Sequence, residues 1–208
     1  KKSESEKLDY YEKALESMLS AVRTAELEEY KPKENWYVLM AACYSELSSR
    51  IGKEEALYKQ LDIYEILVNL YPKKMYFIQL GGIYGQLNRE LDYMITLNAA
   101  YQKDLLDKES EYLALTQLLL LNNNPYWAAK VLEAGRTKKV PVIDEKTKEE
   151  KILPVVKDNE KNLKLLADAW RMAQEIELAI PIMEKAARLA KDGQTFIILG
   201  SLYLSEDK

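Results

Sequence analysis

Residues 162–189 read NLKLLADAWRMAQEIELAIPIMEKAARL, and their spacing predicts two amphipathic helices joined by a short polar turn near Gln174. Apolar residues recur at three- and four-residue steps in both helices: Leu163, Leu166, Ala167 and Trp170, then Ala179, Met183 and Ala186. Small residues let two antiparallel helices approach closely, while large neighbours fill the volume around the contact. The stretch therefore predicts a tightly packed antiparallel helix pair.

We call the first helix of such a pair the leading helix and the second the trailing helix. The apolar pattern of the leading helix recurs along the chain, and copies of it start at Phe77, Tyr112, Leu163 and Phe196. Positions 77 and 112 lie 35 residues apart, and positions 163 and 196 lie 33 apart. This spacing resembles the tetratricopeptide repeat, a helix-turn-helix unit of about 34 residues with W-x2-L-G-x2-Y in its first helix. The resemblance implies an all-α fold, a right-handed α-α superhelix of antiparallel helix pairs. It also implies that residues 1–208 are a single solenoid fragment with incomplete units at both ends. A generic helical bundle is the alternative, and it would lack these steps.

The first complete unit has two registers that fit the template. One starts at Trp36, and the other, starting one residue later, is Tyr37, Met40, Ala41 and Tyr44. Before this unit, apolar spacing predicts a helix from Ser5 to about Glu29, ended by Lys31-Pro32.

An insertion of about 17 residues separates the unit at Tyr112 from the unit at Leu163, because that step is 51 residues. Residues 140–156 contain two short runs rich in β-branched residues, VPVI and ILPVV, around the charged segment DEKTKEEK. They predict an inserted β-hairpin in which Pro141 and Pro154 confine each arm to an edge. A disordered loop is the alternative.

Composition excludes several classes of function. Thirty basic and 34 acidic residues give a formal net charge of −4, so no basic field attracts nucleic acid. The chain has no histidine, the commonest general base and metal ligand, so we expect neither an enzyme nor a metal or cofactor site. The single cysteine, Cys43, fits a buried apolar position. The sequence contains no run of about 18 apolar residues, so it predicts no membrane span.

Tetratricopeptide arrays bind partners on the concave groove lined by their leading helices, so the resemblance places candidate partner-binding residues there. Those residues are Tyr37, Ala41 and Tyr44, then Ile78, Gly82 and Gln86, then Leu113, Gln117 and Leu120, then Lys164, Asp168 and Arg171. Packing against neighbouring helices is the alternative for each residue. The cations all lie on the last of these helices, which disfavours a clamp for a C-terminal carboxylate.

A narrower resemblance covers Leu70 to Tyr203 and includes the segments KESE, NEKNL and LADAW. These segments look like the periplasmic tetratricopeptide proteins found beside TonB, ExbB and ExbD in γ-proteobacteria. The resemblance implies a non-catalytic scaffold that binds a protein or extended peptide and serves TonB-dependent energy transduction in iron uptake. It also implies a periplasmic location after removal of a signal peptide, with the cytoplasm as the alternative. A receptor for small ligands or cell-wall fragments, using the Tyr-rich first unit, is the alternative function.

Overall fold

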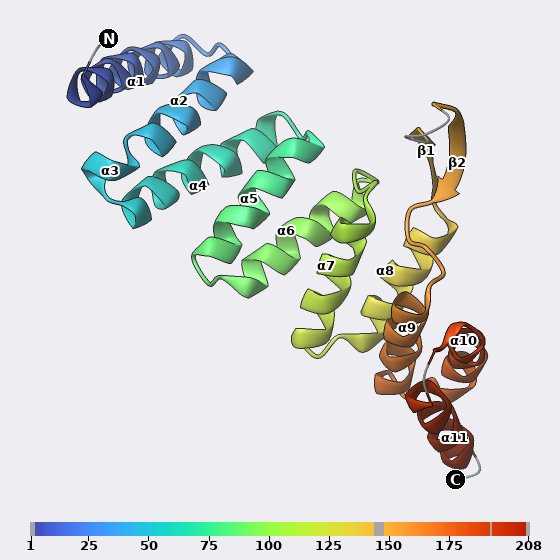
Figure 1. Cartoon of the computed structure of the whole chain (residues 1–208). Coiled ribbons are helices and arrows are strands. Elements are labelled where there is room, and N and C mark those ends of the chain that lie inside the picture. The colour runs from blue at the N-terminus through green and yellow to red at the C-terminus, as the bar shows by residue number, and fades with distance from the viewer. Residues whose placement is uncertain (1–2, 144–147, 192, 207–208) are drawn as a thin grey trace. The chain divides into compact units, whose positions relative to one another are not determined.

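The computed structural model describes residues 3–143, 148–191 and 193–206. The chain divides into two compact units, residues 1–105 and residues 106–208, and each is built of helices packed in sequence order (Figure 1). The fold is an all-α solenoid with one small hairpin, and within the described ranges the only sheet has two strands. A single array over residues 1–208, and its right-handed superhelix, stay predictions.

The first unit holds six helices among its described residues: α1 (Glu4–Leu27), α2 (Glu34–Glu46), α3 (Ser48–Ile51), α4 (Lys53–Leu70), α5 (Lys74–Gln86) and α6 (Glu90–Gln102). Helix α1 begins at a capping box, in which the Ser3 hydroxyl accepts from the Glu6 backbone N–H and the Glu6 carboxylate accepts from that of Ser3. Pairs α1 and α2, α2 and α4, α4 and α5, and α5 and α6 pack together. The helix predicted from Ser5 to about Glu29 is confirmed.

Left-handed residues turn the chain between leading and trailing helices. Asn88, Asn123 and Gln174 have φ angles of 56°, 54° and 63° at the turns after α5, α7 and α9. Asparagine tolerates this conformation better than most residues. The turn predicted near Gln174 is therefore confirmed.

Helices α5 and α6 approach closely because Gly81 has no side chain. A Cβ atom at Gly81 would lie 2.8 Å from both Cδ2 and Cε2 of Tyr93 on α6. Tyr93 stands where this repeat usually carries alanine. The glycine thus provides the space that the tyrosine ring occupies.

The second unit holds five helices among its described residues: α7 (Glu109–Leu121), α8 (Pro125–Thr137), α9 (Glu160–Met172), α10 (Ile176–Leu189) and α11 (Gln194–Glu206). The quoted stretch forms α9 and α10, and its Ala167, Trp170, Ala179 and Met183 side chains are fully buried. Burying this apolar surface stabilises the unit, since each fully buried large side chain contributes about 1.5–3 kcal/mol.

The predicted insertion is a hairpin of β1 (Lys139–Ile143) and β2 (Glu150–Pro154), paired antiparallel with Pro141 opposite Ile152. Residues 144–147, the first half of the predicted charged segment, lie outside the described residues. The second arm ends at Pro154, two residues before the predicted end. Val155 and Val156 leave the strand because their side chains are buried against the helices of the second unit.

The hairpin is fixed at its base. The Val155 and Val156 N–H groups donate to the Lys138 and Gly135 carbonyls, each at 2.9 Å. Below them, Arg136 binds both carboxylate oxygens of Asp158 at 2.6 and 2.7 Å. A Cβ atom at Gly135 would lie 2.5 Å from Val156 Cγ2, so only glycine fits there.

Candidate functional site

The leading helices α2, α5, α7 and α9 share one division between core and surface. Counted from the first residue of each helix, residues 4, 7 and 8 are buried in all four. Residues 5, 9 and 12 of these four helices are half-buried or exposed, as are residues 4, 8 and 11 of α11, and we call this set the leading-helix surface. They are Val38, Ala42, Ser45, Ile78, Gly82, Gly85, Leu113, Gln117, Leu120, Lys164, Asp168, Arg171, Ile197, Ser201 and Leu204.

Tyr37 and Tyr44 do not belong to this surface. Tyr37 is only 2% exposed, and half-buried Tyr44 packs against the same core cluster. Burial raises the pKa of both phenols above the ordinary value. Of the two registers that the sequence allows, the structure has the one that starts at Tyr37. The candidate groove positions Tyr37, Ala41 and Tyr44 are therefore corrected to core positions.

The other apolar and amide candidates lie on or beside the leading-helix surface. In the first unit, Ile78 is half-buried, Gly82 is exposed, and exposed Gln86 donates from Nε2 to the Gly82 carbonyl at 3.4 Å. In the second unit, Leu113 is half-buried and Gln117 exposed. Their roles in partner binding stay predictions.

The three charged candidates lie together on α9. Lys164 and Asp168 are half-buried and Arg171 is exposed. The Arg171 Nε and Nη2 atoms donate to Asp168 Oδ1 at 3.3 and 3.2 Å. The pair lies at the surface and contributes little to stability. Both side chains remain accessible to a charged partner.

A glutamate link that the sequence analysis missed joins successive leading helices within each unit. The first residue of one leading helix accepts a hydrogen bond from the third residue of the next, or from the second residue where the next helix is α11. The links are Tyr76 Oη to Glu34, Asn162 Nδ2 to Glu109 at 2.7 Å, and Thr195 Oγ1 to Glu160 at 2.9 Å.

The three donor side chains of these links are buried. Because a buried polar group needs a partner, each link constrains how neighbouring leading helices align. Lys73 also donates to Glu34 at 2.7 Å, and Lys73 and then Tyr76 hold the pKa of that carboxyl below its ordinary value. The links therefore set successive leading helices side by side, α2 with α5 in one unit and α7, α9 and α11 in the other.

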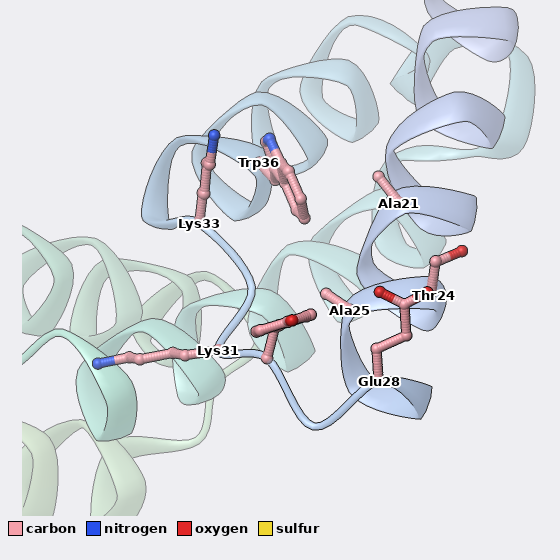
Figure 2. Close-up of a pocket in the computed structure, with 8 residues that line it drawn as sticks. Ala21, Thr24, Ala25, Glu28, Lys31, Lys33 and Trp36 are labelled. Carbon is pink, nitrogen blue, oxygen red and sulfur yellow. The ribbon is translucent and has the colours of Figure 1, made fainter.

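A hollow of about 580 Å³ lies beside Trp36, between the end of α1 and the start of α2 (Figure 2). It is lined by Ala21, Thr24, Ala25, Glu28, Tyr30, Lys31, Lys33 and Trp36. Figure 2 shows Lys33 on one side of the Trp36 indole, and Ala21 and Ala25 on the other. The small alanine side chains leave the second indole face open.

The described residues give little support for a metal site, a reactive cysteine or a membrane-spanning helix. No group of three His, Cys, Asp or Glu side chains in the described ranges could hold a metal ion. Cys43 is buried, and burial raises the pKa of its thiol, which disfavours the nucleophilic thiolate. Across the same ranges, no helix combines the length and the apolar character that crossing a bilayer requires.

Comparison with known proteins supports the fold. No family model matches the sequence, and no curated protein matches it. One similar solved structure is that of YrrB, described as a tetratricopeptide protein with an unusual peptide-binding site. The two sequences are 13% identical, and the match covers 88% of this chain and 83% of YrrB with a TM-score of 0.55. MamA from Desulfovibrio magneticus RS-1 is 17% identical over 80% of this chain and 85% of its own, with a TM-score of 0.48. The likeness to YrrB shows a tetratricopeptide-type fold.

Proposed function

We propose that the chain is a non-catalytic scaffold that binds a protein or extended peptide on its leading-helix surface. The observation that carries the proposal is the set of glutamate links. Within each unit they align successive leading helices, so that side chains which packing does not use face the same side. Such a surface can bind a partner, and this binding requires no catalytic residue.

The two units offer a partner different chemistry. In the first unit, Val38, Ala42, Ile78 and Gly82 form a surface of small and apolar residues, which suits bulky apolar side chains. In the second unit, Lys164 and Arg171 add positive charge to α9 beside Asp168. The peptide-binding site named for YrrB is consistent with this proposal.

The partner that we propose is a periplasmic segment of TonB, ExbB or ExbD, with this chain in the periplasm. What supports this choice is the resemblance over Leu70 to Tyr203, in particular the KESE, NEKNL and LADAW segments.

The test is a binding assay with the 208-residue chain immobilised and the three periplasmic segments in solution. A double variant, Lys164→Glu with Arg171→Glu, should weaken binding. Arg188→Glu is the matched control, because it reverses an exposed charge on the trailing helix α10. Equal loss in the control and the double variant would count against the leading-helix surface. If none of the three segments binds, the choice of partner is wrong and the scaffold proposal moves to other peptides.

A further inference from the structure

The hollow beside Trp36 combines an aromatic wall with a carboxylate. The indole presents its open face to the hollow, across from Ala21 and Ala25, and Figure 2 shows the Glu28 carboxylate beside Thr24. Tyr30, which is 68% exposed, also lines the hollow. An aromatic face beside a carboxylate is a setting that attracts a cation.

On the open side of the Trp36 indole, the free charge is negative. Lys31 is directed away, since its Nζ donates to the Leu70 carbonyl at 2.9 Å and lies 4.0 Å from the centre of the Tyr71 ring. Lys33 lies at the opposite indole face, with its Nζ 5.8 Å from the ring centre. Among the described residues, the Glu28 carboxylate has no ion pair or hydrogen bond. A cation entering the hollow would therefore meet an unpaired carboxylate.

The same unit already holds an arginine in this way. The Arg89 guanidinium carbon lies 4.7 Å from the centre of the Tyr84 ring, while its Nε donates to Asp92 Oδ2 at 2.7 Å. A planar guanidinium can stack on a ring and bind a carboxylate at once, which an ammonium does less well. Trp36 and Glu28 offer the same two groups without the arginine.

We infer that the hollow beside Trp36 binds an arginine side chain of a protein or peptide partner. The guanidinium stacks on the open face of Trp36 and pairs with Glu28. The small side chains of Ala21 and Ala25 leave space for this planar group. The site is separate from the leading-helix surface, and it extends the proposed function by assigning a specific residue type to a second contact.

The test uses small probes, so that it does not depend on knowing the partner. Heteronuclear NMR of the 208-residue chain follows the three tryptophan indole N–H signals, with the Trp36 signal assigned by Trp36→Phe. The probes are the acetylated amides of arginine, of citrulline, which has nearly the same shape without charge, and of norleucine, which is apolar. The arginine probe should shift the Trp36 signal saturably, and the other two should bind more weakly.

Glu28→Gln should weaken the arginine probe about threefold to fivefold, as expected for one exposed ion pair. Glu29→Gln is the matched control, because that adjacent carboxylate does not line the hollow, and it should leave binding unchanged. The inference is overturned if the Trp36 signal does not respond, if citrulline or norleucine binds equally well, or if both glutamate variants have the same effect. None of these results bears on peptide binding at the leading-helix surface, so the two proposals fail separately.

Discussion

Two adjacent glycines of α5 should respond in opposite ways to the same substitution. Replacing either by alanine removes backbone freedom from the unfolded chain and favours the helix by about 1 kcal/mol. A Cβ atom at Gly82 would meet nothing within 4 Å, whereas one at Gly81 would lie 2.8 Å from two carbons of the Tyr93 ring. Gly82→Ala should therefore raise the free energy of unfolding, and Gly81→Ala should lower it.

The size of the difference follows from the contact. Non-bonded carbons prefer a separation of about 3.5–4.0 Å, so the Tyr93 ring must move by about 1 Å to admit the new methyl group. Overpacking of this kind costs about 1–3 kcal/mol. Because both variants gain the same helix propensity, the gap between their free energies of unfolding should be about 1–3 kcal/mol.

Urea denaturation followed by far-ultraviolet circular dichroism measures both variants against the wild type. A further pair, Tyr93→Ala with and without Gly81→Ala, isolates the contact, because alanine at position 93 removes the ring that the methyl group meets. In that background, Gly81→Ala should no longer be destabilising. If Gly81→Ala stabilises the chain as much as Gly82→Ala does, the close approach of α5 and α6 does not restrict position 81.

Three other contacts, at the hairpin base and at Glu34, can be tested by single substitutions. Gly135→Ala should lower the free energy of unfolding by about 1–3 kcal/mol in urea denaturation, since the added methyl group overlaps the buried valine at the hairpin base; unchanged stability would contradict this packing. Arg136 holds the pKa of Asp158 below its ordinary value, so this pair stabilises the fold above the unfolded pKa of about 3.9 and stops doing so as pH falls through the lowered value. Asp158→Asn should thus lower stability by about 0.5–1 kcal/mol at neutral pH, with thermal melts converging in acid; a gap that persists in acid would argue against the ion pair. Burial, and then the hydrogen bond to Glu34, raise the pKa of Tyr76 to about 12. The pKa of the phenol in the unfolded chain is near 10, so the free energy of unfolding should fall as pH rises from about 10 to 12. In urea titrations over this pH range, Tyr76→Phe should reduce that fall. An unchanged dependence on pH would exclude Tyr76 as its source.

Local spacing was enough to predict much of the fold. The alternation of alanine with large residues in 162–189 determines which faces of α9 and α10 can touch, and those faces are the buried ones. The inserted runs VPVI and ILPVV predicted a hairpin because β-branched residues favour strands. The last two valines of the second run were assigned to the strand because their burial depends on contacts that local spacing does not contain.

The site was harder to predict because it depends on contacts between helices. Trp36 and Tyr37 are adjacent aromatics, and both fit the template, so packing decides which one enters the core. The glutamate links join residues 35 to 53 positions apart, and a glutamate near a helix start usually has a solvated carboxylate. The useful signal was the position of Glu34, Glu109 and Glu160, each three residues before the first core residue of its leading helix.

The attachment of the hairpin to the second unit determines how far the hairpin segment can be altered. The carbonyl of Lys138 and the N–H of Val155 are hydrogen-bonded to each other at 2.9 Å, so the chain leaves the helices and returns to them at one point. Lengthening a loop whose ends already meet adds little closure entropy. The segment between these residues can therefore be exchanged, shortened or extended while the helices keep their packing. That makes it a suitable place to graft an epitope or a fluorescent reporter.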